Sequence, residues 1–197
     1  MELYESFMKF RFADEDVFRI ETDAAVKQMQ GREVCECVVL LLPNVVWIEA
    51  KASSPKPQNR ERTDKFINNI CKKFADSLSL FDDFRSGRLG DEAFGRLPLH
   101  LQGELPDWSH YLICLIIHGH CLEWLVGLQD TFRDAMYQQV KDWGIKDSNI
   151  RVYNEEMALS KQLIVAYIPK SERDSVRQPN GNMDPELAKQ WFEDHGY

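Results

Sequence analysis

Two acidic residues and a lysine stand near the ends of two apolar segments within VCECVVLLLPNVVWIEAKASS, residues 34–54. Glu36 opens the first segment, and the second ends in Ile48-Glu49-Ala50-Lys51. Charged side chains beside so apolar a segment are costly unless they are partnered or bind an ion. A carboxylate pair suits a hard divalent cation such as Mg²⁺, and a nearby ammonium can orient a water or stabilise developing negative charge.

The two segments are predicted to be strands of one hairpin, because Val, Ile, Leu and Trp dominate them. Pro43 cannot take the positive φ of a type I′ turn, so we expect a wider turn over residues 42–45. Pairing about that turn places Glu36 opposite Lys51. Side chains alternate across a strand, so Glu36, Glu49 and Lys51 share one face of the sheet. The alternative is a partly exposed Glu-Lys ladder at a sheet edge.

An acidic residue on one strand, followed by E-x-K on the next and preceded by a helix that carries Glu, resembles the PD-(D/E)xK nuclease superfamily. The matching residues are Glu36, Glu49 and Lys51, with Glu5 as the helix carboxylate. The resemblance covers residues 1–75 well and the remainder as an order of elements. It implies an α/β (α+β) fold with a restriction-endonuclease-like αβββαβ core, in which helices flank a mixed sheet.

The resemblance further implies a metal-dependent nuclease that hydrolyses phosphodiester bonds of DNA or RNA. Glu36 and Glu49 would hold Mg²⁺ or Mn²⁺, Lys51 would position the attacking water, and Glu5 would support the metal ligands or act as a base. The first acidic residue is usually Asp in the superfamily, and Asp23 is a rival to Glu36 for that role.

Two classes of function remain open. The first is the nuclease itself, working within a larger nucleic-acid-processing or antiviral defence complex. The second is a catalytically inactive subunit that keeps the nuclease-like fold and acts as a binding or scaffolding component. Glu in place of Asp, an acidic surface and an aromatic C-terminal helix favour the second.

Hydrophobic periodicity and breaker residues predict the other elements. Helices are expected over residues 2–12, 60–85, 122–143 and 184–197, and strands over 17–22, 111–118, 150–153 and 163–168. In the helix over 60–85, Lys65 is the candidate to lend a polar side chain to the site. His118-Gly-His120-Cys121 has no further ligand cluster at zinc-like spacing, so these histidines are interpreted as strand-end residues.

The chain is predicted to form a nuclease-like domain over residues 1–169, a polar linker over 170–183 and a C-terminal helix over 184–197. Its 197 residues suffice for one domain with a substantial core. Asp184 as N-cap and Pro185 in the first turn predict where the last helix begins. Trp191 and Phe192 would be costly to leave in water, so that helix either folds back or docks on another chain.

The net charge of −8 is unfavourable for binding nucleic acid without help. Between Lys51 and Lys73, however, seven basic residues stand against two acidic ones. The predicted nucleic-acid contacts are Lys56, Arg60, Arg62, Lys65, Lys72 and Lys73. We therefore expect weak, salt-sensitive binding to nucleic acid alone and a partner subunit or homo-oligomer that supplies further affinity.

Three features bear on location. Five cysteines without a C-x-x-C pair indicate a reducing cytoplasm rather than a disulfide framework. The first residues, MELYESFMKFRFADED, lack the layout of a signal peptide. No run approaches 18 apolar residues without charge, so we expect no membrane span.

Overall fold

Eight strands and seven helices are present in residues 1–56 and 58–197, which are the residues that this computed structural model describes. One sheet contains β3 (Val17–Phe18), β4 (Cys37–Leu41), β5 (Asn44–Lys51), β6 (Tyr111–Ile117) and β7 (Ile150–Tyr153). A second contains β1 (Glu2–Glu5), β2 (Met8–Arg11) and β8 (Ala166–Tyr167). The helices are α1 (Ala24–Gln28), α2 (Arg60–Arg85), α3 (Asp91–Gly95), α4 (Leu99–Gln102), α5 (Leu122–Val140), α6 (Glu155–Ser160) and α7 (Pro185–Asp194).

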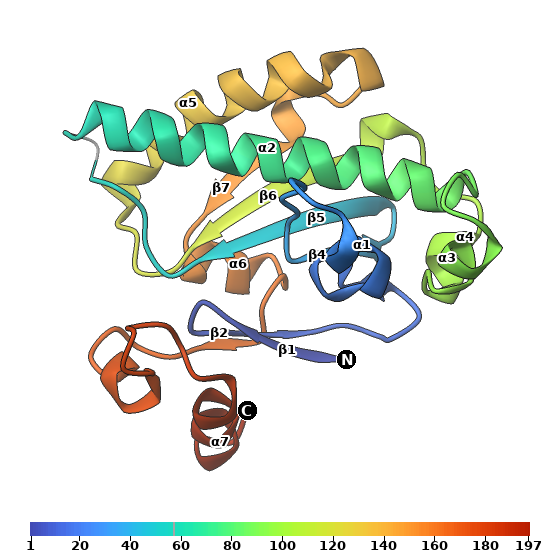
Figure 1. The fold of residues 1–197 in the computed structure, drawn as a ribbon. Helices are drawn as coiled ribbons and strands as arrows, with labels where there is room; N and C mark the ends of the chain where they lie inside the picture. The colour runs from blue at the N-terminus through green and yellow to red at the C-terminus, as the bar shows by residue number, and fades with distance from the viewer. Residues whose placement is uncertain (57) are drawn as a thin grey trace.

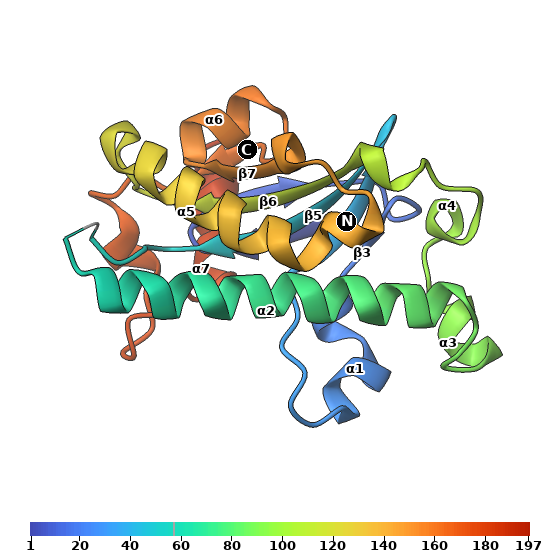
Figure 2. The same cartoon turned by 90° about the horizontal axis from the view of Figure 1, so that it is seen from above.

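The larger sheet is mixed and has the strand order β3-β4-β5-β6-β7. The first three strands are antiparallel to their neighbours, whereas β5, β6 and β7 run parallel. Parallel neighbours need a crossover, and α2 and α5 lie within the two crossover connections. The two helices cover one face of the sheet, and the smaller sheet lies on the other side (Figures 1 and 2). The expectation of a mixed sheet flanked by helices is therefore confirmed.

The main core lies between the larger sheet and the two long helices. Trp47 of β5 is fully buried and packs edge-on against Phe81 of α2, with ring centroids 5.2 Å apart. Phe74 of α2 meets Phe132 of α5 at 5.9 Å. The face of β5 that carries Trp47 also carries Glu49 and Lys51, because side chains alternate along a strand. These two charged side chains therefore point toward α2.

β4 and β5 form the predicted central hairpin, but the predicted register is wrong by two residues. Cys37 pairs with Ile48 and Leu41 pairs with Asn44, so only Leu42 and Pro43 connect the strands. Glu36 therefore does not face Lys51 across the hairpin. A shift of two residues leaves every side chain on the same face, so the hydrophobic pattern cannot distinguish the two registers.

The helix expected over residues 2–12 is also wrong, because β1 and β2 form a hairpin there. Ser6 and Phe7 make its two-residue turn, with φ angles of 52° and 65°. Such a turn usually favours Gly, Asn or Asp. Here Phe7 is buried with Ile168 and Val176, and this packing stabilises the turn. The αβββαβ order is thus not matched at its beginning.

The expected strand over residues 17–22 is shorter than predicted. β3 covers Val17–Phe18, and a 3₁₀ turn follows at Ile20–Thr22. The strand expected over residues 163–168 is likewise reduced to β8, and the helix expected over 184–197 ends at Asp194. α2 and β7 have the predicted bounds, and α5 ends three residues before the predicted end. Long periodic segments fix their own type of element, whereas short strands depend on their partners.

Residues 170–183, predicted to be a polar linker, contribute to the interior. They contain a 3₁₀ turn at Arg173–Val176, and the buried Arg173 donates a hydrogen bond to the carbonyl of Ala52 over 3.1 Å. α7 begins with the predicted cap, since the Asp184 side chain accepts from the backbone N–H groups of residues 186 and 187. Phe192 of α7 is fully buried against the chain itself. The C-terminal helix therefore folds back.

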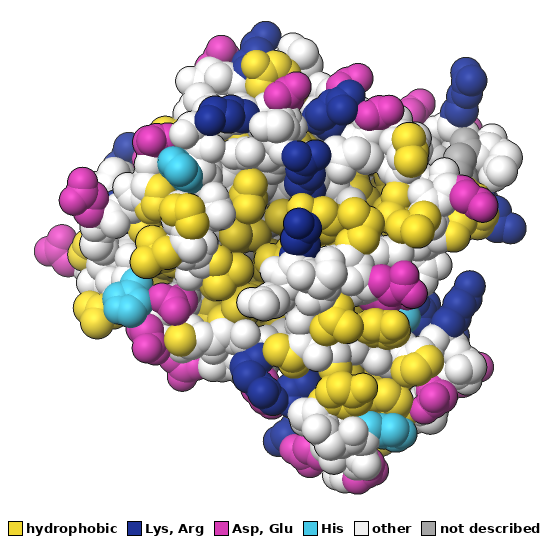
Figure 3. Space-filling model, turned by 180° about the vertical axis from the view of Figure 1, so that it is seen from behind, with side chains coloured by type: hydrophobic (Ala, Val, Ile, Leu, Met, Phe, Trp, Pro, Cys, Tyr) yellow, Lys and Arg dark blue, Asp and Glu magenta, His cyan; other side chains and the backbone are white. Residues whose placement is uncertain are grey.

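Seen from the side opposite to Figure 1, acidic and basic side chains are interspersed, and hydrophobic side chains gather in a band across the middle (Figure 3). None of the helices in the described residues is both long and apolar enough to cross a membrane.

Candidate functional site

Three of the four predicted catalytic residues, Glu5, Glu36 and Lys51, line a cavity of about 340 Å³ beside the end of β5. The β1–β2 turn, the 3₁₀ turn after β3, the chain before β4, the end of β5, α2 and the loop before α7 all contribute to its walls. The charged residues that line it are Glu5, Glu21, Glu36, Lys51 and Lys73. Segments far apart in sequence thus bring three carboxylates and two ammonium groups to one hollow.

Glu49 is the buried anion behind this cavity, with no exposed surface. Its Oε1 lies 2.5 Å from Nζ of Lys51 and 2.8 Å from Nζ of Lys73. Its Oε2 has no hydrogen-bond partner among the described residues. Both oxygens of this carboxylate are buried, so Lys51 and Lys73 are the groups that offset the cost of burying its charge.

Glu36 is only 5% exposed and shares the site with Glu49. Burial raises the pKa of Glu36 well above its usual value of 4.5, and the charge of Glu49 and the contact with the Glu21 carboxyl raise it further. Burial likewise raises the pKa of Glu5, with a second contribution from the charge of Glu21. Glu36 and Glu5 therefore hold their protons more readily than exposed glutamates do.

The pKa of Lys73 is also raised, but for a lysine a raised pKa favours the charged form. Burial lowers its pKa, but the charge and hydrogen bond of Glu49 raise it by more, so the net pKa is above the usual value. The ammonium is therefore a fixed positive charge at neutral pH. Together the four carboxylates and the two lysines carry a formal charge of −2 when all are ionised, which a single divalent cation would neutralise.

The carboxylate oxygens at the cavity are donors of the kind that would suit a magnesium ion held mainly through water. Among the residues that the structure describes, no group of three or more His, Cys, Asp and Glu side chains is arranged to hold a metal ion. Mg²⁺ usually keeps several waters and is bound through one or two carboxylates. Glu36, which lines the cavity, and Glu49, which is buried behind it, are the carboxylates that would supply these contacts.

Two other predicted candidates lie elsewhere. Lys65 is 75% exposed and pairs with Glu61 of its own helix over 2.8 Å. Asp23 is the N-cap of α1 and forms an ion pair of 2.9 Å with Arg96. Both side chains are engaged in these ion pairs, and neither lines the cavity.

Two residues of the cavity were missed by the sequence analysis. Lys73 was assigned to nucleic-acid contact, although it lies three residues after Ile70 and four before Ser77, both of which are buried. That spacing places Lys73 beside the core stripe of α2 and could have revealed it. Glu21 gave no such signal, because the 3₁₀ turn that directs it toward Glu36 replaces an expected strand.

The predicted nucleic-acid contacts divide into two groups. Lys65, Lys72 and Lys73 are engaged in ion pairs with Glu61, Asp76 and Glu49 respectively. Lys56, Arg60 and Arg62 are exposed and line a second hollow of about 580 Å³ around the start of α2. This second group is the better placed to contact phosphate.

Comparisons with protein-family models, with curated proteins and with solved structures gave no match for the chain.

Proposed function

We propose that the chain is a Mg²⁺- or Mn²⁺-dependent nuclease of the PD-(D/E)xK type. The observation that carries the proposal is the buried pair of Glu36 and Glu49, which stands beside Lys51 and Lys73 at an open cavity. The sheet supports it as well, because the hairpin of β4 and β5 continues through α2 into the parallel strand β6. The hairpin of β1 and β2 takes the position of the first helix and still brings Glu5 to the cavity.

In this proposal Glu36 and Glu49 bind the cation. When bound, the ion supplies positive charge to the phosphate and lowers the pKa of water. Lys51 holds the attacking water and stabilises negative charge that develops on the phosphate. Glu5, with its raised pKa, accepts a proton from that water. Lys73 keeps Glu49 ionised and oriented.

Nuclease activity is tested with labelled single-stranded DNA, double-stranded DNA and RNA. We expect cleavage with Mg²⁺ or Mn²⁺, none with chelator, and none by Lys51→Ala with its circular dichroism unchanged. Lys141→Ala is the matched control, because Lys141 is exposed beyond the C-terminal end of α5 and its side chain hydrogen-bonds only to Gln138 among the described residues. Cleavage by Lys51→Ala, or cleavage that chelator leaves unaffected, would reject the proposal.

A second candidate function is a catalytically inactive subunit of a larger assembly. It is favoured by the two ammonium groups on Oε1 of Glu49, which already compensate this carboxylate as a structural ion pair would. Calorimetric titration with Mg²⁺ separates the two functions. The nuclease predicts binding by the wild type that Glu49→Ala and Glu36→Gln abolish, whereas the inactive subunit predicts no binding by any of them.

A further inference from the structure

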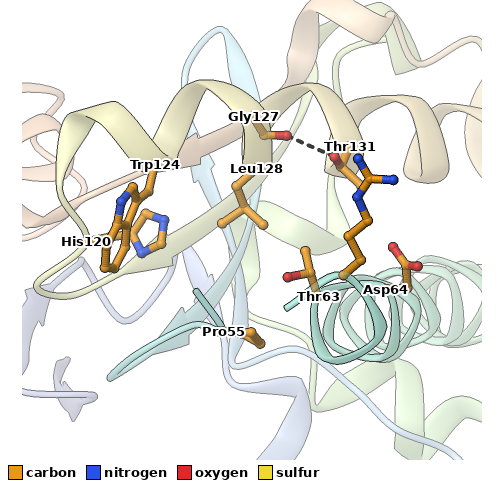
Figure 4. Close-up of a pocket in the computed structure, with 9 residues that line it drawn as sticks. Pro55, Thr63, Asp64, His120, Trp124, Gly127, Leu128 and Thr131 are labelled. Atoms are coloured by element: carbon orange, nitrogen blue, oxygen red, sulfur yellow. Dashed lines mark hydrogen bonds between the residues drawn. The ribbon is translucent and has the colours of Figure 1, made fainter. Parts of the chain in front are cut away.

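A separate cavity of about 290 Å³ lies between the N-terminal halves of α2 and α5 (Figure 4). One end is aromatic, since the rings of His120 and Trp124 stand 5.6 Å apart at an angle of 70°. Thr63 and Asp64 from α2 form the opposite, polar end, and Leu128 lies between the two ends (Figure 4). The cavity thus offers a flat apolar wall and, across from it, hydrogen-bonding groups.

The aromatic end is held in place before any ligand arrives. His120 is 5% exposed, and its Nδ1 lies 2.9 Å from the hydroxyl of Ser54. Burial lowers the pKa of His120 below its usual value of 6.5, so the imidazole is neutral at neutral pH. A neutral, immobilised ring beside Trp124 suits a flat uncharged ligand.

Positive charge adjoins this cavity. The hollow that contains Lys56 and Arg62 shares Pro55 and Arg60 with it. In addition, α5 begins at the cavity without a side-chain cap, and N–H groups at the start of a helix favour anions. An anionic group attached to a flat ring would therefore find its partners directly beside the aromatic cavity.

We propose that this cavity binds an unpaired nucleotide. The base lies against Trp124 with its polar edge toward Thr63 and Asp64, and the phosphate lies on Arg60 and its basic neighbours. A duplex keeps its bases stacked and paired, so the ligand is a nucleotide of a single strand or a free mononucleotide.

The inference rests on the proposed function for the choice of a single strand as ligand. The short segment from Lys51 to Pro55 joins the two cavities, and it spans at most about 14 Å when extended. One strand can therefore occupy both cavities, with its phosphate at the carboxylates and an unpaired base against Trp124. The chain then acts on single-stranded rather than duplex nucleic acid.

Binding is tested by fluorescence anisotropy of a short labelled single strand of DNA, in chelator so that no cleavage occurs. Loss of one stacked base weakens binding at least about fivefold, and we expect this for Trp124→Ala. Val126→Ala on the same helix is the matched control, because Val126 is 68% exposed and does not line the cavity. The control variant binds as the wild type does.

Gly127→Leu is a second variant that distinguishes loss of the binding site from a folding defect in Trp124→Ala. Gly127 lines the cavity, and a Cβ at this position would meet nothing within 4 Å. Replacing a helical glycine also favours the helix, so the variant is expected to fold and to fill the cavity. It too should weaken binding of the strand at least about fivefold. Unchanged affinity in both Trp124→Ala and Gly127→Leu would overturn the proposal.

Two competitors identify the ligand. A strand of abasic nucleotides should compete poorly, and competition equal to that of the normal strand overturns base binding. AMP is the second competitor. If AMP displaces the labelled strand as effectively as an unlabelled strand does, the cavity is assigned to free nucleotides. Weak displacement by AMP assigns it to a strand. If the wild type binds the strand but does not cleave it in Mg²⁺, the proposed nuclease function is rejected and this inference stands. If the wild type cleaves and both Trp124→Ala and Gly127→Leu bind with unchanged affinity, this inference alone is rejected.

Discussion

Glu36→Gln should make the metal-free protein more stable at neutral pH, because it removes a buried carboxyl with a raised pKa. Above the usual carboxyl pKa of 4.5, the unfolded chain has lost this proton while the folded chain still holds it. Raising the pH therefore lowers the free energy of unfolding. Each pH unit costs up to about 1.4 kcal/mol per group, so Glu36 alone costs the wild type up to about 2.7 kcal/mol between about pH 5.5 and 7.5.

Urea denaturation in chelator at these two pH values measures this loss. Glu36→Gln lacks this carboxyl, so its free energy of unfolding should fall by less than that of the wild type. The difference between the two losses should be up to about 2.7 kcal/mol. Glu5 also has a raised pKa and titrates in both proteins, so the difference between them isolates Glu36. Glu92→Gln is the control, because Glu92 is 95% exposed and its variant should follow the wild type.

Magnesium should narrow the difference in stability between Glu36→Gln and the wild type. A ligand that binds only the folded state at 100 times its dissociation constant adds about 2.7 kcal/mol. The wild type should gain stability from Mg²⁺ at neutral pH, whereas Glu36→Gln should gain little. The reasoning fails if wild type and Glu36→Gln show the same pH dependence in chelator, since Glu36 would then be an ordinary carboxylate.

Three further variants test the packing that positions the site. Lys73→Met should lower the free energy of unfolding, measured by urea denaturation, by about 3 kcal/mol, because the buried carboxylate of Glu49 loses one partner. Lys65→Met removes an exposed ion pair and should cost less than about 1 kcal/mol. Equal losses would contradict the burial of Glu49. Phe192→Ala should cost about 3–5 kcal/mol and lower the Tm, and an unchanged Tm would show that α7 does not pack on the chain. Asp184→Ala removes the cap of α7 and should cost about 1 kcal/mol of stability. The loss should appear as faster amide hydrogen exchange confined to that helix. Exchange in α7 that is no faster than in the wild type would argue against the cap.

The parts of the fold that were predicted well are those in which local signals agree. α2 carries an uninterrupted apolar stripe over 26 residues, and its predicted bounds match the structure. The start of α7 was predicted from Asp184 and Pro185, whose roles as N-cap and first-turn residue are purely local. Residues 2–12 failed because a short apolar pattern suits a helix and a hairpin alike, and burial of Phe7 by distant residues decided between them.

The sequence by itself determined that Glu36, Glu49 and Lys51 share a face, because parity along a strand survives an error of two residues in register. It also determined that a basic stretch follows them. Only the tertiary structure decided which side chains complete the site. Lys73 reaches Glu49 from a helix that crosses the sheet, and Glu21 reaches Glu36 through a 3₁₀ turn. Such contacts join residues far apart in the chain and depend on packing, which no local pattern encodes.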